Sequence, residues 1–227
     1  MSLIRVALVA VETIFTQLAT TPPNKTPTKG RYNTEEIFVM RFAPLIFALQ
    51  RPFILACLLL DTLAVLAPHL PTNALTPLGL TIHAHQRITI PFLLGVTMTV
   101  AGSALRLTCF RTLGKLFTFD LAVCDDHKLV TSGPYGIVRH PSYLGSLLLV
   151  GGLTTAQLTR GGGLMESGLL RPGGAPVLAY WAAWWAWALA CATRRAAAED
   201  EEMRRQFGKE WEDYARRVRW WFVPGLV

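Results

Sequence analysis

Five apolar stretches dominate the sequence, and each is close to the length that a helix needs to cross a bilayer. They occupy residues 3–19, 43–67, 90–107, 142–158 and 175–193. About 20 apolar residues in a helix cover the roughly 30 Å of hydrocarbon in a membrane. Hydrophobic residues make up 52% of the chain and charged residues only 16%, which argues against a disordered chain and an ordinary soluble enzyme. The sequence therefore predicts an all-α integral membrane bundle of about five transmembrane helices.

Charged residues interrupt the first two stretches. Glu12 lies in the middle of the first, where a lone charge costs about 2.5–3.5 kcal/mol on insertion scales. Either a contact with another helix or an interfacial position of the segment would relieve this cost. In the second stretch, Arg51 precedes Pro52, which suits the first position of a helix. Residues 37–50 are therefore expected along the membrane surface, with the span beginning near Pro52.

The distribution of Lys and Arg predicts the orientation of the chain. The connections at 20–42, 106–141 and 194–227 hold 4, 5 and 8 of them, whereas the alternate segments hold 1, 1 and 2. The positive-inside rule places the first set, including the carboxy terminus, in the cytoplasm. The net charge of +7 is thus largely a topology signal. Binding to nucleic acid is not expected, because the 8 basic residues of the tail are set against 7 acidic ones and no basic groove carries interleaved aromatic residues.

The cysteines predict neither a metal site nor a disulfide framework. All four are scattered, without a C-x-x-C or Cys/His ligand spacing: Cys57, Cys109, Cys124 and Cys191. They are interpreted as reduced, packed thiols.

Polar residues collect between the third and fourth stretches. Ser132-Gly133-Pro134 predicts a turn, and Pro141 predicts the first residue of the next helix. The free N–H groups at that helix start would favour an anion near Arg139 and His140. A basic anchor at the mouth of a span explains the Arg-His-Pro triplet equally well.

A second polar cluster follows the last stretch and contains Glu199 and Asp200. Beyond it, apolar residues recur at the spacing of an amphipathic cytoplasmic helix: Met203, Phe207, Trp211, Tyr214 and Val218. Its polar side offers three i,i+4 ion pairs: Glu201/Arg205, Glu212/Arg216 and Asp213/Arg217. Because the last two spans form a hairpin, both polar clusters should surface on one side and share one site.

Glu201 and Glu202 are expected on a solvated face. The tryptophans of the last span are interpreted as packing or lipid-facing bulk rather than a lipid path: Trp181, Trp184, Trp185 and Trp187.

The motifs in these two clusters resemble those of a known family. The run H-x-L-V-T-S-G-P-Y-x-x-V-R-H-P-S-Y-L-G is followed by R-x-x-x-E-D-x-x-M-x-x-x-F-G-x-x-W-x-x-Y-x-x-R-V and V-P-G. This pattern is similar to the isoprenylcysteine carboxyl methyltransferases, integral membrane enzymes that in eukaryotes reside in the endoplasmic reticulum. They use S-adenosylmethionine to methylate the carboxylate of a prenylated carboxy-terminal cysteine. The resemblance covers Leu113 to Gly225, which suggests membrane helices in residues 1–112 and a methyltransferase core in 113–227.

The resemblance also implies roles for particular residues. The S-adenosylmethionine pocket would be made by His127, Lys128, Leu129, Val130, Tyr135, His140, Pro141, Ser142 and Tyr143. Glu199 would hold the amino group of the cofactor, Arg195 would contact the substrate, and Arg139 would lie near the reacting carboxylate. The implied partners are prenylated CaaX-type proteins or prenylcysteine, and membrane lipid. The family usually has Pro after the Arg-Val pair, whereas Arg219 stands there in this chain, which leaves the role of the tail open.

Two other enzyme classes and a scaffold remain as alternatives. A phospholipid N-methyltransferase shares the Arg-His-Pro and acidic-pair arrangement, but its amine acceptor must lose a proton and gains nothing from a carboxylate-binding Arg195. A membrane sterol reductase has a similar terminal region and would imply NADPH. A scaffold without activity would not need both polar clusters intact. A carboxylate acceptor with a pKa near about 3.5 is already ionised at neutral pH and needs no base.

Overall fold

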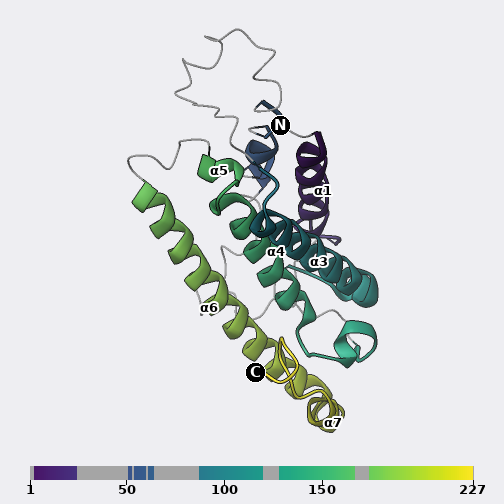
Figure 1. Ribbon diagram of the computed structural model, residues 1–227. Helices are drawn as coiled ribbons and strands as arrows, with labels where there is room; N and C mark the ends of the chain where they lie inside the picture. The colour runs from purple at the N-terminus through teal and green to yellow at the C-terminus, as the bar shows by residue number, and fades with distance from the viewer. Residues whose placement is uncertain are drawn as a thin grey trace, which may run out of the picture.

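The computed structural model describes residues 3–24, 51, 52, 54–59, 61–63, 87–119, 128–166 and 174–226, and within them it contains helices and no strands (Figure 1). The α-helices are α1 (Leu3–Ala19), α3 (Ile90–Leu113), α4 (Pro141–Leu158), α5 (Gly163–Glu166), α6 (Gly174–Phe207) and α7 (Lys209–Arg217). Two 3-10 turns, η4 (Gly114–Leu116) and η5 (Gly133–Gly136), flank the loop after α3. Residues 51, 52, 54–59 and 61–63 are also helical. The predicted all-α class is confirmed.

Local sequence signals set the ends of several helices. The Thr89 hydroxyl accepts a hydrogen bond from the Phe92 N–H at 3.3 Å and caps the start of α3. Pro141 is the first residue of α4, as predicted, since its missing N–H would have no partner there. Gly133 has a φ of 59°, a left-handed conformation that suits glycine in the predicted turn.

Two helices extend further than the hydrophobic pattern predicted. α3 ends at Leu113 rather than at 107. α6 continues from the last apolar stretch, through the acidic cluster, to Phe207. Gly208, with a φ of 50°, then separates α6 from α7, so the single amphipathic helix expected over residues 203–218 is wrong. A helix can continue beyond its apolar stretch, because helix propensity depends on local backbone preference rather than on hydropathy.

Ion pairs on this carboxy-terminal segment use a different register from the predicted one. The structure pairs residues three apart rather than four: Glu201 with Arg204, Glu202 with Arg205 and Asp213 with Arg216. Both spacings bring side chains together on a helix. The predicted apolar stripe does gather, because Trp211, Tyr214 and Val218 form a buried cluster with Met203 and Phe207 against Leu129.

Glycines allow α3 and α4 to pack at close range. A β carbon on Gly152 would lie 2.3 Å from Thr99 Oγ1 and 2.5 Å from the carbonyl oxygen of Gly95. A β carbon on Gly102 would lie 2.5 Å from the carbonyl oxygen of Gly145. Small residues at such positions let helix backbones approach closely, as they do in membrane helix pairs. α3 and α4 therefore form the rigid centre of the molecule.

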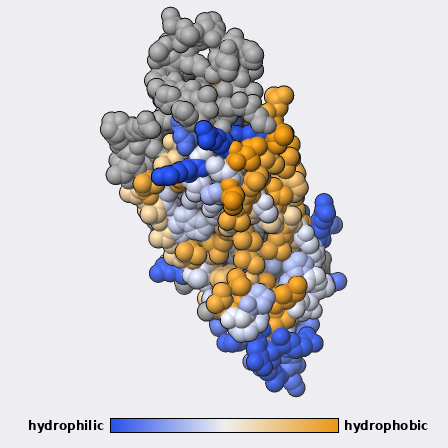
Figure 2. Space-filling model, in the orientation of Figure 1, coloured by the Kyte–Doolittle hydropathy of each residue, from blue (hydrophilic) through white to orange (hydrophobic). Residues whose placement is uncertain are grey.

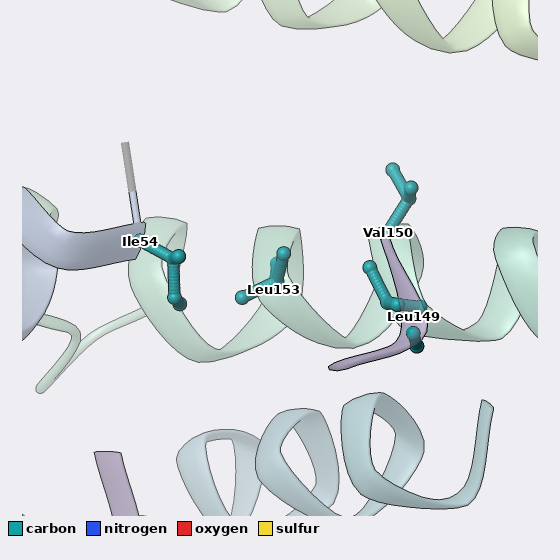
Figure 3. Close-up of a cluster of buried hydrophobic side chains, with 5 residues drawn as sticks. Ile54, Leu149, Val150 and Leu153 are labelled. Carbon is teal, nitrogen blue, oxygen red and sulfur yellow. The ribbon is translucent and has the colours of Figure 1, made fainter. Parts of the chain in front are cut away.

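A buried apolar cluster joins this centre to the neighbouring helices. Leu149, Val150 and Leu153 of α4 pack with Ile54 and Ala19 (Figure 3). Trp184 and Trp185 of α6 pack against the same cluster. The side chain of Trp185 also donates a hydrogen bond from Nε1 to Thr154 Oγ1 at 3.1 Å. Two of the four tryptophans of α6 thus serve as packing bulk, as expected.

The helix ends sort into two groups. In Figure 1 the starts of α1 and α6 lie with α5 toward the top of the molecule, α3 crosses its middle, and the end of α6 lies with α7 at the bottom. α4 runs from the α7 end toward α5, so its first residues face the carboxy-terminal part of α6 (Figure 1). This arrangement brings the two polar clusters of the sequence to the same end.

Apolar side chains cover much of the outer surface. Leu3, Ile14 and Leu18 of α1 are 76%, 57% and 53% exposed. Figure 2 shows orange surface over the middle of the molecule and blue surface at the α7 end. By length and composition, the helical segment Ile90–Leu116, with 27 residues, could cross a membrane, and it is the only such helix among the described residues.

Some expectations concern residues outside the described ranges. These are residues 37–50 and most of 43–67, together with Cys124 and His127. The remaining cysteines are free and buried, as predicted: Cys57, Cys109 and Cys191. The expected boundary between residues 112 and 113 falls in the last turn of α3.

Candidate active site

The residues before α4 are held in place by the carboxy-terminal tail. The backbone N–H of Arg139 donates to the carbonyl of Trp220 at 2.9 Å, and that of His140 donates to the carbonyl of Trp221 at 2.9 Å. The ring of Trp221 also meets the ring of His140 edge-on, with centroids 6.2 Å apart. The carboxy-terminal tail thus packs against the polar cluster and fixes the backbone of Arg139 and His140.

His140 joins the two polar clusters. Its Nε2 lies 3.0 Å from Asp200 Oδ1, and its Nδ1 lies 3.3 Å from Glu199 Oε2. A carboxylate only accepts hydrogen bonds, so both ring nitrogens must donate, which defines the charged imidazolium. The expectation that these distant segments meet in one place is confirmed. The anions facing His140 are side chains from α6.

The electrostatics of this contact favour the charged forms of both His140 and Glu199. Burial alone would lower the pKa of His140, but its hydrogen bonds to Asp200 and Glu199 raise that pKa to about 9. Burial would raise the pKa of Glu199, but the hydrogen bond and charge of His140, with help from Arg195, hold that pKa below its usual value. At neutral pH the site therefore holds a positive imidazolium on His140 beside the ionised carboxylate of Glu199.

Arg139 is strongly held. Its Nη1 lies 2.9 Å from Asp200 Oδ2, and its Nη2 donates to the carbonyl of Arg219 at 3.3 Å. The guanidinium lies 5.8 Å from the ring centroids of both Trp211 and Trp221, which is within the range of cation–π attraction. Its Nε is buried without a hydrogen-bond partner. Arg139 is therefore fixed in orientation but keeps one unused donor.

Arg195 and Glu199 share a tyrosine. The Tyr143 hydroxyl donates a short hydrogen bond to Glu199 Oε1 and accepts one from Arg195 Nε at 3.2 Å. Arg195 Nη2 also donates to the carbonyl of Phe119 at 2.7 Å. Residues 195 and 199 are one helical turn apart on α6, which places both side chains over the start of α4.

A cavity of about 250 Å³ lies beside this network. Its polar end includes Glu199, Asp200 and the three arginines Arg106, Arg139 and Arg195. Apolar side chains line the rest of it, chiefly Leu147, Val150, Trp184, Trp187, Ala188 and Phe117. Most of the wall is apolar, as expected for a site that takes a ligand with one charged end and one hydrophobic end.

The cavity gathers most of the residues singled out from the sequence. The residues that line it are Lys128, Leu129, Val130, Tyr135, Arg139, His140, Ser142, Tyr143, Arg195 and Glu199. Pro141 is buried at the start of α4 and is not among the lining residues. Trp184 and Trp187 do line the cavity, so their expected role as mere packing or lipid-facing bulk was incomplete.

Two cavity residues were missed by sequence reasoning. Asp200 was seen as part of the acidic cluster but given no role, although it binds both Arg139 and His140. Arg106 lies in α3, where it donates from Nε to the carbonyl of Ala19 at 3.0 Å and from Nη1 to Ser142 Oγ at 3.3 Å. A lone arginine near the end of an apolar stretch is the only local signal, and it equally suits a basic anchor.

The fold and the cavity define a class of protein: a helical protein with a site that pairs a dense ionic network with an apolar, aromatic wall. The comparisons with known proteins name the family that this class resembles. Residues 94–159 match the model of the isoprenylcysteine carboxyl methyltransferase (ICMT) family. The resemblance seen in the motifs is thereby confirmed, and it begins earlier in the chain than Leu113, where the motifs had placed its start.

Individual relatives agree with this family. Protein-S-isoprenylcysteine O-methyltransferase B of Arabidopsis thaliana is 46% identical over 56 residues, which are 24% of this chain and 28% of the relative. A probable protein-S-isoprenylcysteine O-methyltransferase of Oryza sativa subsp. indica is 29% identical over 126 residues, 55% of this chain and 56% of the relative. Delta(14)-sterol reductase ERG24A of Gibberella zeae is 31% identical over 114 residues, 44% of this chain and 24% of the relative. The chain thus spans about a quarter to just over half the length of these relatives.

Proposed function

We propose that this protein transfers a methyl group from S-adenosylmethionine to the carboxylate of a prenylated cysteine at a protein carboxy terminus. The observation that carries the proposal is the single cavity that joins Glu199, Asp200 and three arginines to an apolar, tryptophan-lined wall. The charged end suits a zwitterionic cofactor and a carboxylate, and the apolar wall suits an isoprenoid chain. The similarity to isoprenylcysteine methyltransferases supports the same reaction.

The donor set at the polar end fits S-adenosylmethionine. Glu199 and Asp200 would hold its ammonium group, and Lys128 would meet its carboxylate. Tyr135, Leu129 and Val130 offer apolar and aromatic surface to the rest of the molecule, with His127 expected beside them from the resemblance. When bound, the cofactor supplies a methyl group on a positively charged sulfur.

The residues of the chain would act mainly by positioning the acceptor. Its carboxylate is already ionised at neutral pH, so no side chain has to remove a proton. Arg195 and Arg139 would orient it, since a guanidinium fork matches a carboxylate and stays charged. Because Asp200 already pairs with Arg139, this arginine would hold a second carboxylate only partially and leave it nucleophilic. Correct alignment of reacting groups can lower a barrier by several kcal/mol.

The hydrophobic part of the substrate explains a membrane setting. Moving an isoprenoid chain into water costs about 0.8 kcal/mol per CH₂, so the acceptor stays in lipid. The exposed apolar side chains of α1 and the apolar length of Ile90–Leu116 support a membrane setting, in which the hydropathy pattern predicts about five spans. In this arrangement residues 1–112 serve as membrane helices, residues 113–227 carry the site, and α7 lies in the cytoplasm. The expected location is the endoplasmic reticulum.

The decisive experiment is an assay of the purified protein with labelled S-adenosylmethionine and a farnesylated cysteine acceptor. We expect a base-labile methyl ester and no product when the carboxylate of the acceptor is blocked. Transfer to a phospholipid amine, or reduction of a sterol with NADPH and no methyl transfer, would replace the proposal. The weaker similarity to sterol reductases makes the second control necessary.

Two substitutions separate the roles within the site. Glu199→Ala should abolish cofactor binding, measured by equilibrium dialysis, because it removes the carboxylate that faces the cavity. Arg139→Ala should lose turnover but keep cofactor affinity. Glu201→Gln is the matched control, since its side chain is 76% exposed and forms an ion pair with Arg204, outside the cavity. Equal activity in all three variants would mean that the site is misplaced.

A further inference from the structure

Arg106 of α3 reaches the cavity, and the steps proposed for methyl transfer give it no role. It lines the cavity, and the residue as a whole is only 3% exposed. Its Nε donates a hydrogen bond to the carbonyl of Ala19 at 3.0 Å. The guanidinium also lies 5.4 Å from the ring centroid of Phe110 and 5.3 Å from that of Phe119, within the range of cation–π attraction. Contacts on several sides therefore fix its orientation.

The same guanidinium holds the first turns of α4. Arg106 Nη1 donates to the carbonyl and to the hydroxyl of Ser142, both at 3.3 Å, and makes a short hydrogen bond to the hydroxyl of Ser146. Residues 142 and 146 are one helical turn apart, and both line the cavity. A single arginine of α3 thus binds two serine hydroxyls of α4 at the cavity wall.

The protons of these two hydroxyls go to different places. A guanidinium only donates hydrogen bonds, so each serine hydroxyl accepts from Arg106 and keeps its own proton for another partner. Ser146 donates its proton to the carbonyl of Ser142 at 3.0 Å. In the part of the chain that the structure describes, no atom accepts the proton of the Ser142 hydroxyl. Ser142 therefore keeps one hydrogen-bond donor for a ligand in the cavity that it lines.

The surroundings of this donor favour an anion. It lies in the first turn of α4, where free backbone N–H groups and the helix dipole supply partial positive charge. Arg106 lies against that turn, and Arg195 approaches it through the hydroxyl of Tyr143 at 3.2 Å. The carboxylate of Glu199, which comes close to the same turn, is already bound by His140 and Tyr143. A carboxylate from a ligand suits the remaining donor.

We propose that the Ser142 hydroxyl donates a hydrogen bond to a substrate carboxylate, and that Arg106 is the positioning residue that orients this hydroxyl. The inference rests on the proposed methyl transfer, in which S-adenosylmethionine and the acceptor each carry a carboxylate. The planar fork of Arg106 holds the carbonyl of Ala19 and the serines of α4 at the same time. The single ammonium group of a lysine could not hold both with the same geometry.

The test measures two binding constants of the purified full-length protein. These are the Kd of S-adenosylmethionine, from equilibrium dialysis, and the KM of a farnesylated cysteine acceptor. Ser142→Ala should weaken one of them about tenfold, the effect of losing a hydrogen bond to a charged group, and should leave the other within about twofold. The constant that changes identifies which carboxylate Ser142 binds. No change in either constant, or an equal change in both, would overturn the proposal.

A double-mutant cycle tests the role of Arg106. Arg106→Lys keeps the charge and loses the fork, so it should weaken the same constant as Ser142→Ala does, by about threefold or more. The double variant should bind no more weakly than Ser142→Ala alone, because Arg106 then has no hydroxyl to orient. If the two effects multiply instead, Arg106 does not act through Ser142. Should Arg106→Lys fail to fold, Arg106→Gln, which buries no charge, takes its place in the cycle.

Two further variants separate the hydrogen bond from the fold of α4. Ser142→Thr keeps a hydroxyl and should keep most of the binding that Ser142→Ala loses. Thr155→Ala is the matched control, because the Thr155 hydroxyl donates to the carbonyl of Gly151 in its own helix at 2.8 Å and the residue is not among those that line the cavity. Both constants should stay unchanged in this control.

The outcomes also separate this inference from the proposed function. An unmodified protein that methylates no farnesylated acceptor would reject the methyl transfer itself. An active protein whose Ser142→Ala variant binds both substrates normally would reject only the role of Ser142 and Arg106.

Discussion

The α3–α4 contact and the α4–α6 contact are built in opposite ways. α3 and α4 meet through glycines, and their backbones approach so closely that a β carbon on Gly152 would overlap Thr99. α4 and α6 meet through large and ionic side chains, with Trp185 bonded to Thr154 in the middle and His140 bonded to Glu199 at one end. The cavity lies along the second contact, and α3 reaches it with Arg106 and Leu113 near its carboxy-terminal end.

This difference shows that the rigid contact of the molecule, between α3 and α4, is distinct from the contact that leaves space for a ligand, between α4 and α6. The close glycine contact leaves no space for a ligand but fixes the start of α4, which presents His140, Ser142 and Tyr143. The side-chain contact holds α6 further away, and space remains between its tryptophans and α4. The three predictions below test this contrast, beginning with the largest expected effect.

Gly152→Ala should break the α3–α4 contact. Its β carbon would lie 2.4 Å from the backbone nitrogen of Thr99 and 2.5 Å from the carbonyl oxygen of Gly95, and backbone atoms cannot rotate away. We expect a loss of about 3 kcal/mol in the free energy of unfolding, or failure to fold. Thermal unfolding in detergent measures it.

Gly151→Ala is the matched control for that variant. Its β carbon would meet only side-chain atoms, Met98 Cε at 3.3 Å and the Trp185 ring at 3.4 Å. We expect a change below about 1 kcal/mol, because alanine also favours the helix by a similar amount. Similar losses in both variants would show that the α3–α4 contact is not specially close.

The ionic part of the α4–α6 contact should make stability depend on pH. The pKa of His140 is about 9 in the folded protein, above its ordinary value of 6.5. The stabilisation that comes from protonated His140 is therefore present in full below about pH 6.5 and is lost as the pH rises through about 9, a decrease on the order of 3 kcal/mol. Unfolding curves across this range measure the loss, and His140→Gln should flatten it. A decrease of the same size in the variant would assign it to another group.

Filling the cavity should change binding and leave the fold intact. Ala188 lines the cavity on α6, so Ala188→Trp should occupy the space for the hydrophobic part of the acceptor. We expect kcat/KM for a farnesylated acceptor to fall about tenfold, equivalent to about 1.4 kcal/mol, with little change in cofactor affinity. Ala186→Trp on the exposed face of α6 is the control. A cofactor affinity that falls as much as kcat/KM would mean that this wall does not hold the acceptor.

The sequence predicted which segments are helical, and it predicted the ends of a helix only where a local signal marks them. The apolar stretch at 3–19 became α1 over Leu3–Ala19, and the stretch at 142–158 became α4 over Pro141–Leu158. These ends coincide with a proline-rich connection and a helix-starting proline, which are local signals. The end of α6 has no such signal before Gly208, so hydropathy alone placed it too early.

The sequence predicted which residues belong to the candidate site, but it did not predict which of them pair with one another. Both motifs named residues that line one cavity, including His140 and Glu199. The partner of Arg139 could not be predicted, because Asp200 lies on another helix and its distance depends on how α6 crosses α4. Arg106 was missed for the same reason: its contacts with Ala19 and Ser142 join three helices.

The sequence by itself determined the helical class, the turn before α4 and the set of charged and aromatic residues available for chemistry. These follow from periodicity and from backbone preferences, which act over a few residues. The tertiary structure decided which carboxylate neutralises which cation, where space remains beside α6, and which buried atoms lack a protein partner. Those properties depend on the distances between helices, and these distances are set by the size of side chains that meet across the bundle, far apart in the chain.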